Sequence, residues 1–157
     1  MSEVAELAEK LRSEGAKLSD FFASLRDEQW QVEVYTEGAV WTIRSILAHL
    51  VTAERAFVKL FEQVRQTGAG VSQDFSIDRY NASEQDKTKD LTPHELLDGY
   101  RAVRADMIQW LSTLSDSDLE KTGRHPFLGE TTLREMVKMI YIHNQMHYRD
   151  LRRVLKD

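Results

Sequence analysis

Residues 132–155 read TLREMVKMIYIHNQMHYRDLRRVL, and this stretch holds both a clear helical pattern and two of the five histidines of the chain. Thr132 precedes the pattern as a helix cap, and Glu135 is placed to complete a capping box with it. The apolar residues recur mostly at steps of three and four, and they are Leu133, Met136, Val137, Ile140, Leu151 and Leu155. This spacing predicts an amphipathic helix that buries one face against other helices.

Three further stretches show the same periodicity, over about residues 2–26, 42–68 and 92–114. The last two of these begin at a threonine cap, and a proline follows the second cap at the first helical position. Glycine ends the stretch that begins at Thr42, as is common at helix C-termini. Four amphipathic helices bury their apolar faces most simply against one another, so the sequence predicts an all-α protein with an antiparallel four-helix bundle.

The connections between these helices differ in length. The first link is short, which predicts that the first two helices are antiparallel neighbours. The other two connections, about residues 69–91 and 115–130, are long for a compact bundle. Long ordered connections often carry binding or catalytic groups, so both are candidates for functional loops, although an ordinary connection is the simpler interpretation of 115–130.

Composition limits the class of protein. A chain of 157 residues, 41% apolar and 30% charged, can bury one hydrophobic core, which predicts a single domain over residues 1–157. The net charge of −5 disfavours binding to nucleic acid, whose phosphates carry the same sign. The sequence shows no long apolar run and no basic-then-apolar leader, which favours a cytoplasmic protein without a membrane span. Because it has no cysteine, any thiol chemistry must arrive with a substrate.

Three histidines fall on the predicted apolar faces. His143 follows Ile140 by three residues and precedes His147 by four, and His49 has the same kind of spacing within its own helix. An unpartnered imidazole in an apolar core costs about 1 to 3 kcal/mol, so the three rings need a shared partner. Two imidazoles at positions i and i+4 can reach one ion, and a third from a facing helix leaves a position open for water or substrate. We therefore predict that His49, His143 and His147 bind one divalent metal ion.

Each of these histidines also has a simpler interpretation when it is taken alone. A His-x-x-x-His pair arises often by chance, and a single buried histidine is more often a hydrogen-bonded core residue than a ligand. The coincidence of all three on inward faces is what favours the metal. His94, at a helix start, and His125, in a loop, are predicted to be solvated.

Four residues are candidates for supporting roles around this site. Glu54 and Asp150 are near enough in sequence to accept the second N–H of a ligand histidine, although a solvated helix face is the favoured interpretation of both. Tyr148 and Arg149 flank His147 and are candidates to approach a substrate. No residue can be assigned as catalytic from the sequence alone.

Several other catalytic motifs are absent from the sequence. A di-iron carboxylate bundle needs Glu-x-x-His on two helices, and no histidine here has a glutamate three residues before it. The His-Glu-x-x-His motif of zincins is also absent, because Asn144 follows His143. The sequence therefore does not support a di-iron site or a zincin-type protease. It also lacks the Gly-x-Ser-x-Gly motif of a serine nucleophile.

Three segments resemble the DinB-like (YfiT-like) superfamily. Residues 41–50, WTIRSILAHL, resemble the segment that carries its first metal histidine, and residues 131–151 look like its last helix with the His-x-x-x-His pair. Residues 78–82, DRYNA, look like its short link before the third helix. The resemblance spans nearly the whole chain.

The resemblance implies a four-helix bundle with up-down-down-up topology, commonly a homodimer, that holds nickel, zinc or another divalent ion by three histidines. These positions correspond to His49, His143 and His147. Characterised relatives include bacillithiol- and mycothiol-dependent S-transferases and a maleylpyruvate isomerase, and many members have no known activity. The implied partners are a small-molecule substrate and a low-molecular-weight thiol as cosubstrate.

Several functions stay open at this point. The leading hypothesis is a metal-dependent thiol S-transferase or a related small-molecule enzyme, in which the metal favours the thiolate of an incoming thiol. A metal that lowers the pKa of water would instead support hydrolysis. The remaining alternatives are a non-catalytic metal- or ligand-binding bundle of a stress response, and an interaction module in which the histidines are only structural.

Overall fold

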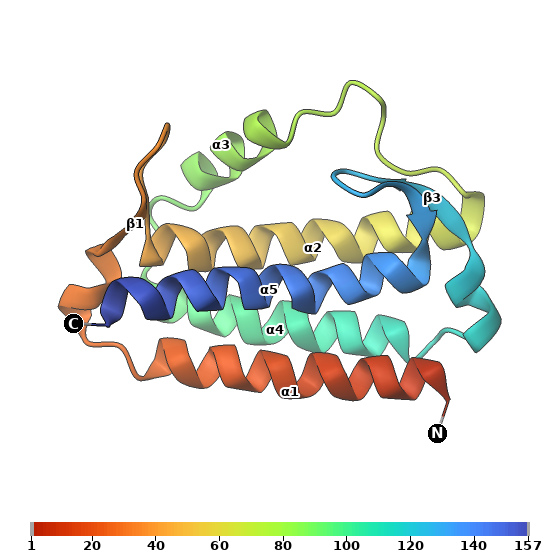
Figure 1. Ribbon diagram of the computed structural model, residues 1–157, viewed down its shortest axis with the longest axis horizontal. Coiled ribbons are helices and arrows are strands. Elements are labelled where there is room, and N and C mark those ends of the chain that lie inside the picture. The colour runs from red at the N-terminus through yellow and green to blue at the C-terminus, as the bar shows by residue number, and fades with distance from the viewer. Residues whose placement is uncertain (1, 157) are drawn as a thin grey trace.

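Four long helices make up most of the chain, as Figure 1 shows for the computed structural model, which describes residues 2–156. They are α1 (Glu3–Ala23), α2 (Ile43–Thr67), α4 (Pro93–Leu111) and α5 (Leu133–Leu155). Each corresponds to one of the four predicted helices and differs from it only at the ends. The prediction of an all-α four-helix bundle is confirmed.

The helix starts follow the predicted capping chemistry. A threonine hydroxyl accepts a hydrogen bond from the backbone N–H three residues later at Thr42, Thr92 and Thr132. At Thr92 the box is complete, because the Glu95 carboxylate accepts from the Thr92 N–H at 2.9 Å. Only one of the two hydrogen bonds of the capping box predicted with Glu135 forms, the one from the Glu135 N–H to the Thr132 hydroxyl. Thr132 also ends a strand, where it pairs with Thr122.

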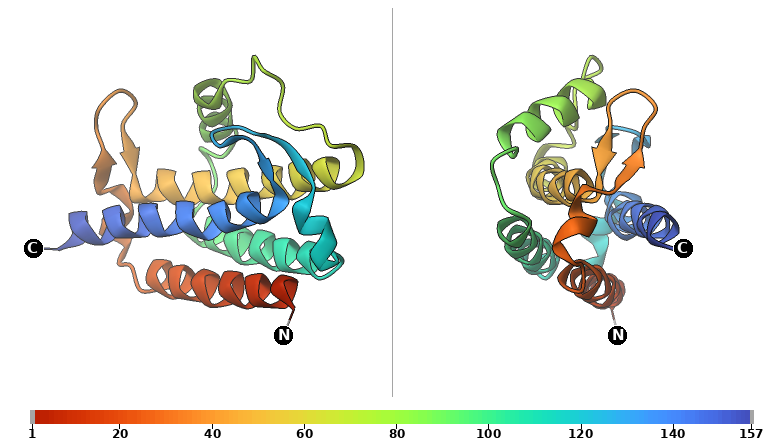
Figure 2. Two further views of the ribbon diagram at one scale, coloured as in Figure 1. Left: turned by 45° about the vertical axis from the view of Figure 1, so that its right-hand side comes forward. Right: turned by 90° about the vertical axis from the view of Figure 1, so that its left-hand side faces the viewer.

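The long helices occupy the corners of the bundle in the order α1, α4, α2, α5, as the end-on view in Figure 2 shows. The two helices α1 and α5 run in one direction and α2 and α4 in the other, which is the up-down-down-up topology. The prediction that the first two helices are neighbours is wrong: α1 and α2 are antiparallel but diagonal. The link between them contains a short helix and a hairpin, so it is long enough to cross the end of the bundle.

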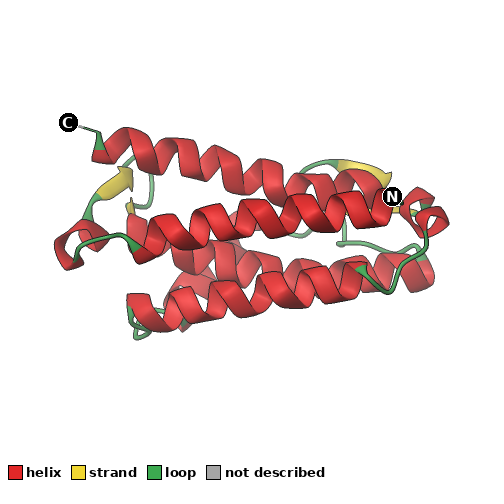
Figure 3. Cartoon of the chain, turned by 90° about the horizontal axis from the view of Figure 1, so that it is seen from below, coloured by secondary structure: helices red, strands yellow, loops and turns green. Residues whose placement is uncertain are grey.

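The three connections hold secondary structure that the periodicity did not predict. They contain the short 3₁₀-helices η1 (Asp27–Gln31) and η2 (Asp116–Glu120), the hairpins β1 (Glu33–Tyr35) with β2 (Trp41–Thr42) and β3 (Thr122–His125) with β4 (Gly129–Thr132), and the helix α3 (Ile77–Lys87). Figure 3 shows the strands near the two ends of the bundle. Strands this short cannot display an alternating pattern, and α3 has no buried residue and hence no apolar stripe.

The core consists of two apolar clusters, one toward each end of the bundle. The first cluster includes Leu11, Phe61 and Met107, and the second includes Leu18 and Leu47. Both clusters contain further buried apolar residues. The helices are apolar on one face only. Within residues 2–156 none of them is both long and apolar enough to span a lipid bilayer.

A buried polar network separates the two clusters. Arg104 of α4 donates two hydrogen bonds to the Glu54 carboxylate of α2, at 2.7 and 2.8 Å, and one to the Leu11 carbonyl of α1 at 2.9 Å. The Asn144 carbonyl oxygen accepts from Arg104 at 3.2 Å and from Tyr100 at 2.8 Å. Glu54 is only 2% exposed. Glu54 therefore belongs neither to a solvated helix face nor to the histidine site, but to a network in which Arg104 connects all four long helices.

Candidate metal centre

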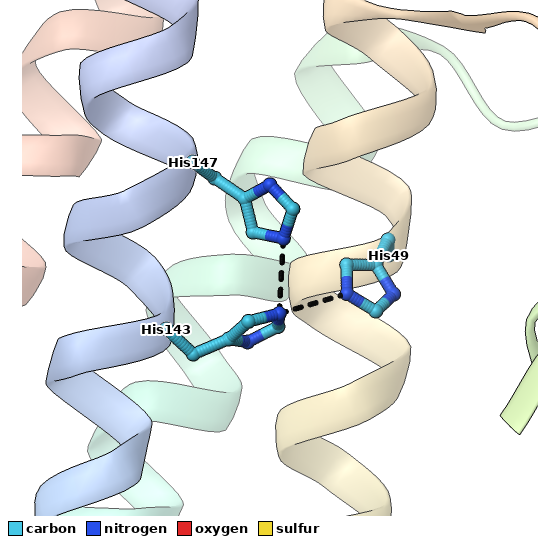
Figure 4. Close-up of side chains that lie close together, drawn as sticks. All are labelled: His49, His143 and His147. Carbon is cyan, nitrogen blue, oxygen red and sulfur yellow. Dashed lines mark hydrogen bonds between the residues drawn. The ribbon is translucent and has the colours of Figure 1, made fainter. Parts of the chain in front are cut away.

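Three histidines from two facing helices converge on one point (Figure 4). His49 lies on α2, and His143 and His147 lie one turn apart on α5. The Nε2 atom of His143 lies 3.3 Å from that of His49 and 2.9 Å from that of His147. One ring nitrogen of each histidine lies within 4.8 Å of the other two. The fold thus brings together the three residues that the sequence singles out.

The spacing of these nitrogens fits a shared metal ion. Two nitrogens bound at about 2.0 to 2.1 Å lie about 2.9 Å apart when they subtend a right angle, and about 3.4 Å apart at the tetrahedral angle. The observed separations of 2.9 and 3.3 Å match these two values. Nitrogen lone pairs this close repel each other unless a proton or a cation lies between them. The donor set therefore suits a divalent ion that accepts imidazole ligands.

Burial keeps the three rings neutral. Burial, together with the charge that a protonated His147 would carry, lowers the pKa of His49 and of His143 to about 3. Burial lowers the pKa of His147 to about 4, although the nearby Asp150 carboxylate acts in the opposite direction. Neutral imidazole is the form that binds metals, so protons do not compete with a cation for this site at neutral pH.

Tyr35, from strand β1, orients the His147 ring. Its hydroxyl donates to the Asp150 carboxylate at 2.6 Å and lies 3.0 Å from Nδ1 of His147. Because the hydroxyl proton is directed to Asp150, the tyrosine oxygen accepts from an N–H on Nδ1. This places the lone pair of His147 on Nε2, the atom that faces the other two histidines. Burial and Asp150 raise the pKa of Tyr35 well above its usual value, so the hydroxyl keeps its proton.

Tyr35→Phe is expected to weaken metal binding about tenfold or more while the stoichiometry stays the same. Loss of an outer hydrogen-bond partner typically costs about 10- to 100-fold in metal affinity, because the ligand ring is no longer held in one tautomer and orientation. Competition titration with a chromophoric chelator measures this change. The matched control is Tyr148→Phe. Tyr148 follows His147 in the sequence, but its own ring packs on Phe21. Equal affinity of Tyr35→Phe and the unaltered protein would show that Tyr35 does not support the site.

The two remaining histidines, His94 and His125, differ in their exposure to solvent. The side chain of His94 is 84% exposed, as predicted. The prediction for His125 is wrong, because it is only 2% exposed. Its Nδ1 accepts from the backbone N–H groups of Phe127 and Leu128 at 3.2 Å, and its ring stacks on Phe57. Burial lowers its pKa to about 4. His125 therefore fixes the turn between β3 and β4 in its neutral form.

The other residues considered from the sequence lie in different places. Asp150 reaches the site through Tyr35 rather than by direct contact with a histidine. Tyr148 packs against α1, and both it and Arg149 line a separate surface groove away from His49. The sequence did not single out Tyr35, nor the Trp41 ring, which lies 5.1 Å from the His49 ring.

A cavity of about 270 Å³ opens beside His49 and His143. It lies between α2, α3, the segment 71–77 and the turn 126–127, and its lining is mainly apolar. Both long connections, which the sequence offered as candidate functional loops, thus contribute walls next to the histidines. A ligand in this cavity would lie directly against two of the three convergent rings.

Comparison with known proteins agrees with this fold. The family model of the DinB superfamily matches residues 10–151. No curated protein is a significant match. The solved structure of YfiT from Bacillus subtilis is similar, with a TM-score of 0.80 and 18% identity, and the match covers 98% of this chain and 87% of that one. That protein is described as "a probable metal-dependent hydrolase with an unusual four-helix bundle topology".

At 18% identity the likeness to YfiT shows a shared bundle fold. The family match shows membership as well as fold, because the matched residues 10–151 include all three histidines and most of each long helix. The chain therefore belongs to the DinB superfamily.

Proposed function

We propose that this protein is a metal-dependent enzyme that binds one divalent ion, nickel or zinc, through His49, His143 and His147 and transfers a low-molecular-weight thiol to a small electrophile. The observation that carries the proposal is the convergence of three neutral imidazole nitrogens beside a cavity. Three protein ligands leave a position open, which is typical of catalytic rather than structural metal sites. A homodimer and a cytoplasmic location stay predictions.

A divalent ion held by three neutral ligands would supply a Lewis acid that lowers the pKa of a thiol or of water. The chain's own residues position this chemistry. Tyr35 and Asp150 hold the His147 ring, and the Trp41 ring packs beside that of His49. The apolar walls of the cavity exclude water from the body of a substrate.

The lining of the cavity favours a thiol over water as the nucleophile. Among the described residues that line it there is no carboxylate to act as a general base. A free thiol has a pKa of about 8.5 and needs little help to ionise, whereas water has a pKa of about 15.7. The protein itself has no cysteine, so the thiol must be a cosubstrate.

Hydrolysis is the second candidate function. The description of YfiT as a probable metal-dependent hydrolase favours it, because the two proteins share their fold over nearly the whole of this chain. The same three histidines would serve it, with water in place of the thiol. The two functions differ in whether turnover requires an added thiol.

The test begins with metal-free protein reloaded with nickel or zinc, which is expected to hold about one equivalent by elemental analysis. The loaded protein is then given 1-chloro-2,4-dinitrobenzene with cysteine, bacillithiol or mycothiol. The thiol sulfur forms a bond to the ring carbon, chloride leaves, and the thiol proton passes to solvent. We expect turnover above the uncatalysed rate with at least one thiol, lost in His147→Ala and kept in His94→Ala.

Each alternative result has a defined meaning. Hydrolysis of a p-nitrophenyl ester by the loaded protein without any thiol would replace thiol transfer by the second candidate. One equivalent of metal with neither activity would contradict the enzymatic proposal and favour a binding protein. No uptake of metal would contradict the site itself.

A further inference from the structure

Helix α3 is attached to α2 through polar contacts rather than through apolar packing. The Tyr80 hydroxyl donates to the Thr52 carbonyl at 3.2 Å, and the Gln85 amide donates to the Ser45 carbonyl at 2.8 Å. No residue of α3 is buried. The two helices are therefore held together without closing on each other, and part of the space between them is the cavity beside His49.

The remaining walls of this cavity are also fixed. The Val71 N–H donates to the Arg124 carbonyl at 3.0 Å, and a Cβ atom at Gly70 would collide with the Arg124 backbone, so only glycine permits this approach. On the other side, His125 pins the turn that carries Phe127. The cavity is thus formed by anchored segments, as is usual for small-molecule sites.

The chemistry of the lining changes along the cavity. The His49 and His143 rings mark one end, and the body is lined by aromatic and aliphatic groups such as Phe57, Phe75 and Phe127. Among the described lining residues Lys59 is the one with a formal charge at neutral pH, and its side chain is exposed to solvent. A ligand with a charged or heavily hydroxylated body would lose its hydration there without gaining partners.

The size of the cavity limits the ligand. Its volume of about 270 Å³ equals the share of roughly nine water molecules in the liquid, at about 30 Å³ each. A ligand of about ten non-hydrogen atoms fits this space. An extended peptide or a nucleotide would project out of its open side.

We infer that the electrophilic substrate is a small molecule with an uncharged alkyl or aryl body of about ten non-hydrogen atoms, which lies between α2 and α3 with its reactive group at the His49 and His143 end. The assignment of the reactive end rests on the proposed function. The preference for an apolar body rests on the cavity walls alone, so the two can be tested separately.

Two probe series test the inference by calorimetry. The first compares acetohydroxamate with hexanohydroxamate on the zinc-loaded protein, where the hydroxamate takes the place of the reactive group. Four added methylenes should tighten binding roughly 250-fold, since each buried methylene contributes roughly a factor of four. The second series compares ethanol with 1-hexanol on the metal-free protein, and only hexanol should bind measurably.

Ala56→Trp fills the cavity from α2, where Ala56 is half-buried and lines it. This variant is expected to bind both hydroxamates with nearly equal affinity, to keep one equivalent of zinc and to lose hexanol binding. Ala102→Trp on α4 adds the same side chain at an exposed position and should behave like the unaltered protein.

The outcomes distinguish the cavity from the metal site. Equal affinities for the two hydroxamates in the zinc-loaded protein, with zinc bound, would overturn the inference and leave the proposed function standing. Hexanol binding that is lost in Ala56→Trp, in a protein that takes up no metal, would uphold the apolar cavity and contradict the proposed function. Absence of both hexanol binding and chain-length dependence would remove the inference altogether.

Discussion

His143→Ala is expected to weaken metal binding by about 100- to 1000-fold. His143 is the central one of the three proposed ligands, because its Nε2 lies within 3.3 Å of the Nε2 of both other histidines. Structural zinc sites with four ligands bind with about 10 to 16 kcal/mol, so one ligand accounts for about 2.5 to 4 kcal/mol. At about 1.4 kcal/mol per factor of ten, this corresponds to roughly two to three decades in affinity.

Competition titration against a chromophoric chelator, with elemental analysis of the dialysed protein, measures the loss. His49→Ala and His147→Ala should show losses of the same order, because each removes one of the three proposed ligands. His94→Ala is the matched control, since this histidine is exposed and lies outside the group of three. A His143→Ala variant that binds metal as tightly as the unaltered protein would overturn the assignment of the site.

The long helices could be predicted from the sequence because each carries its own local signals. Threonine caps and three- and four-residue apolar steps fix the ends and the inward face of a helix without reference to the rest of the chain. The diagonal position of α1 and α2 could not be predicted in this way, since it depends on how the hairpin of β1 and β2 crosses the end of the bundle. Helix α3 was missed because it buries no residue.

The candidate site was likewise predictable where it depends on a single helix, and not where it depends on contacts between distant segments. His143 and His147 are one turn apart on a single helix, so their common direction follows from the sequence. Tyr35 was not predictable, because 112 positions separate it from His147 and it is contributed by a three-residue strand. Glu54 was misjudged because five residues along a helix turn a side chain about 140° away, from the side of His49 toward α4.

Arg104→Met is expected to lower the free energy of unfolding by about 3 to 5 kcal/mol. The substitution leaves the Glu54 carboxylate, which is 2% exposed, without its cationic partner in the core. Removing one member of a buried ion pair costs about this much, because the remaining charge is desolvated and uncompensated. Urea unfolding of the metal-free protein, followed by circular dichroism, measures the change.

The double variant Arg104→Met with Glu54→Leu separates the ion pair from packing. It should recover most of the lost stability, since a buried pair replaced by apolar groups of similar size is often neutral or stabilising. Arg12→Met is the surface control: Arg12 pairs with Glu9 at 2.6 Å, but both side chains are more than half exposed, so its unfolding should be nearly unchanged. If Arg104→Met unfolds like Arg12→Met, the network does not stabilise the bundle. If the single variant is destabilised and the double variant recovers, the arginine compensates a buried charge at a point where apolar residues would serve stability equally well.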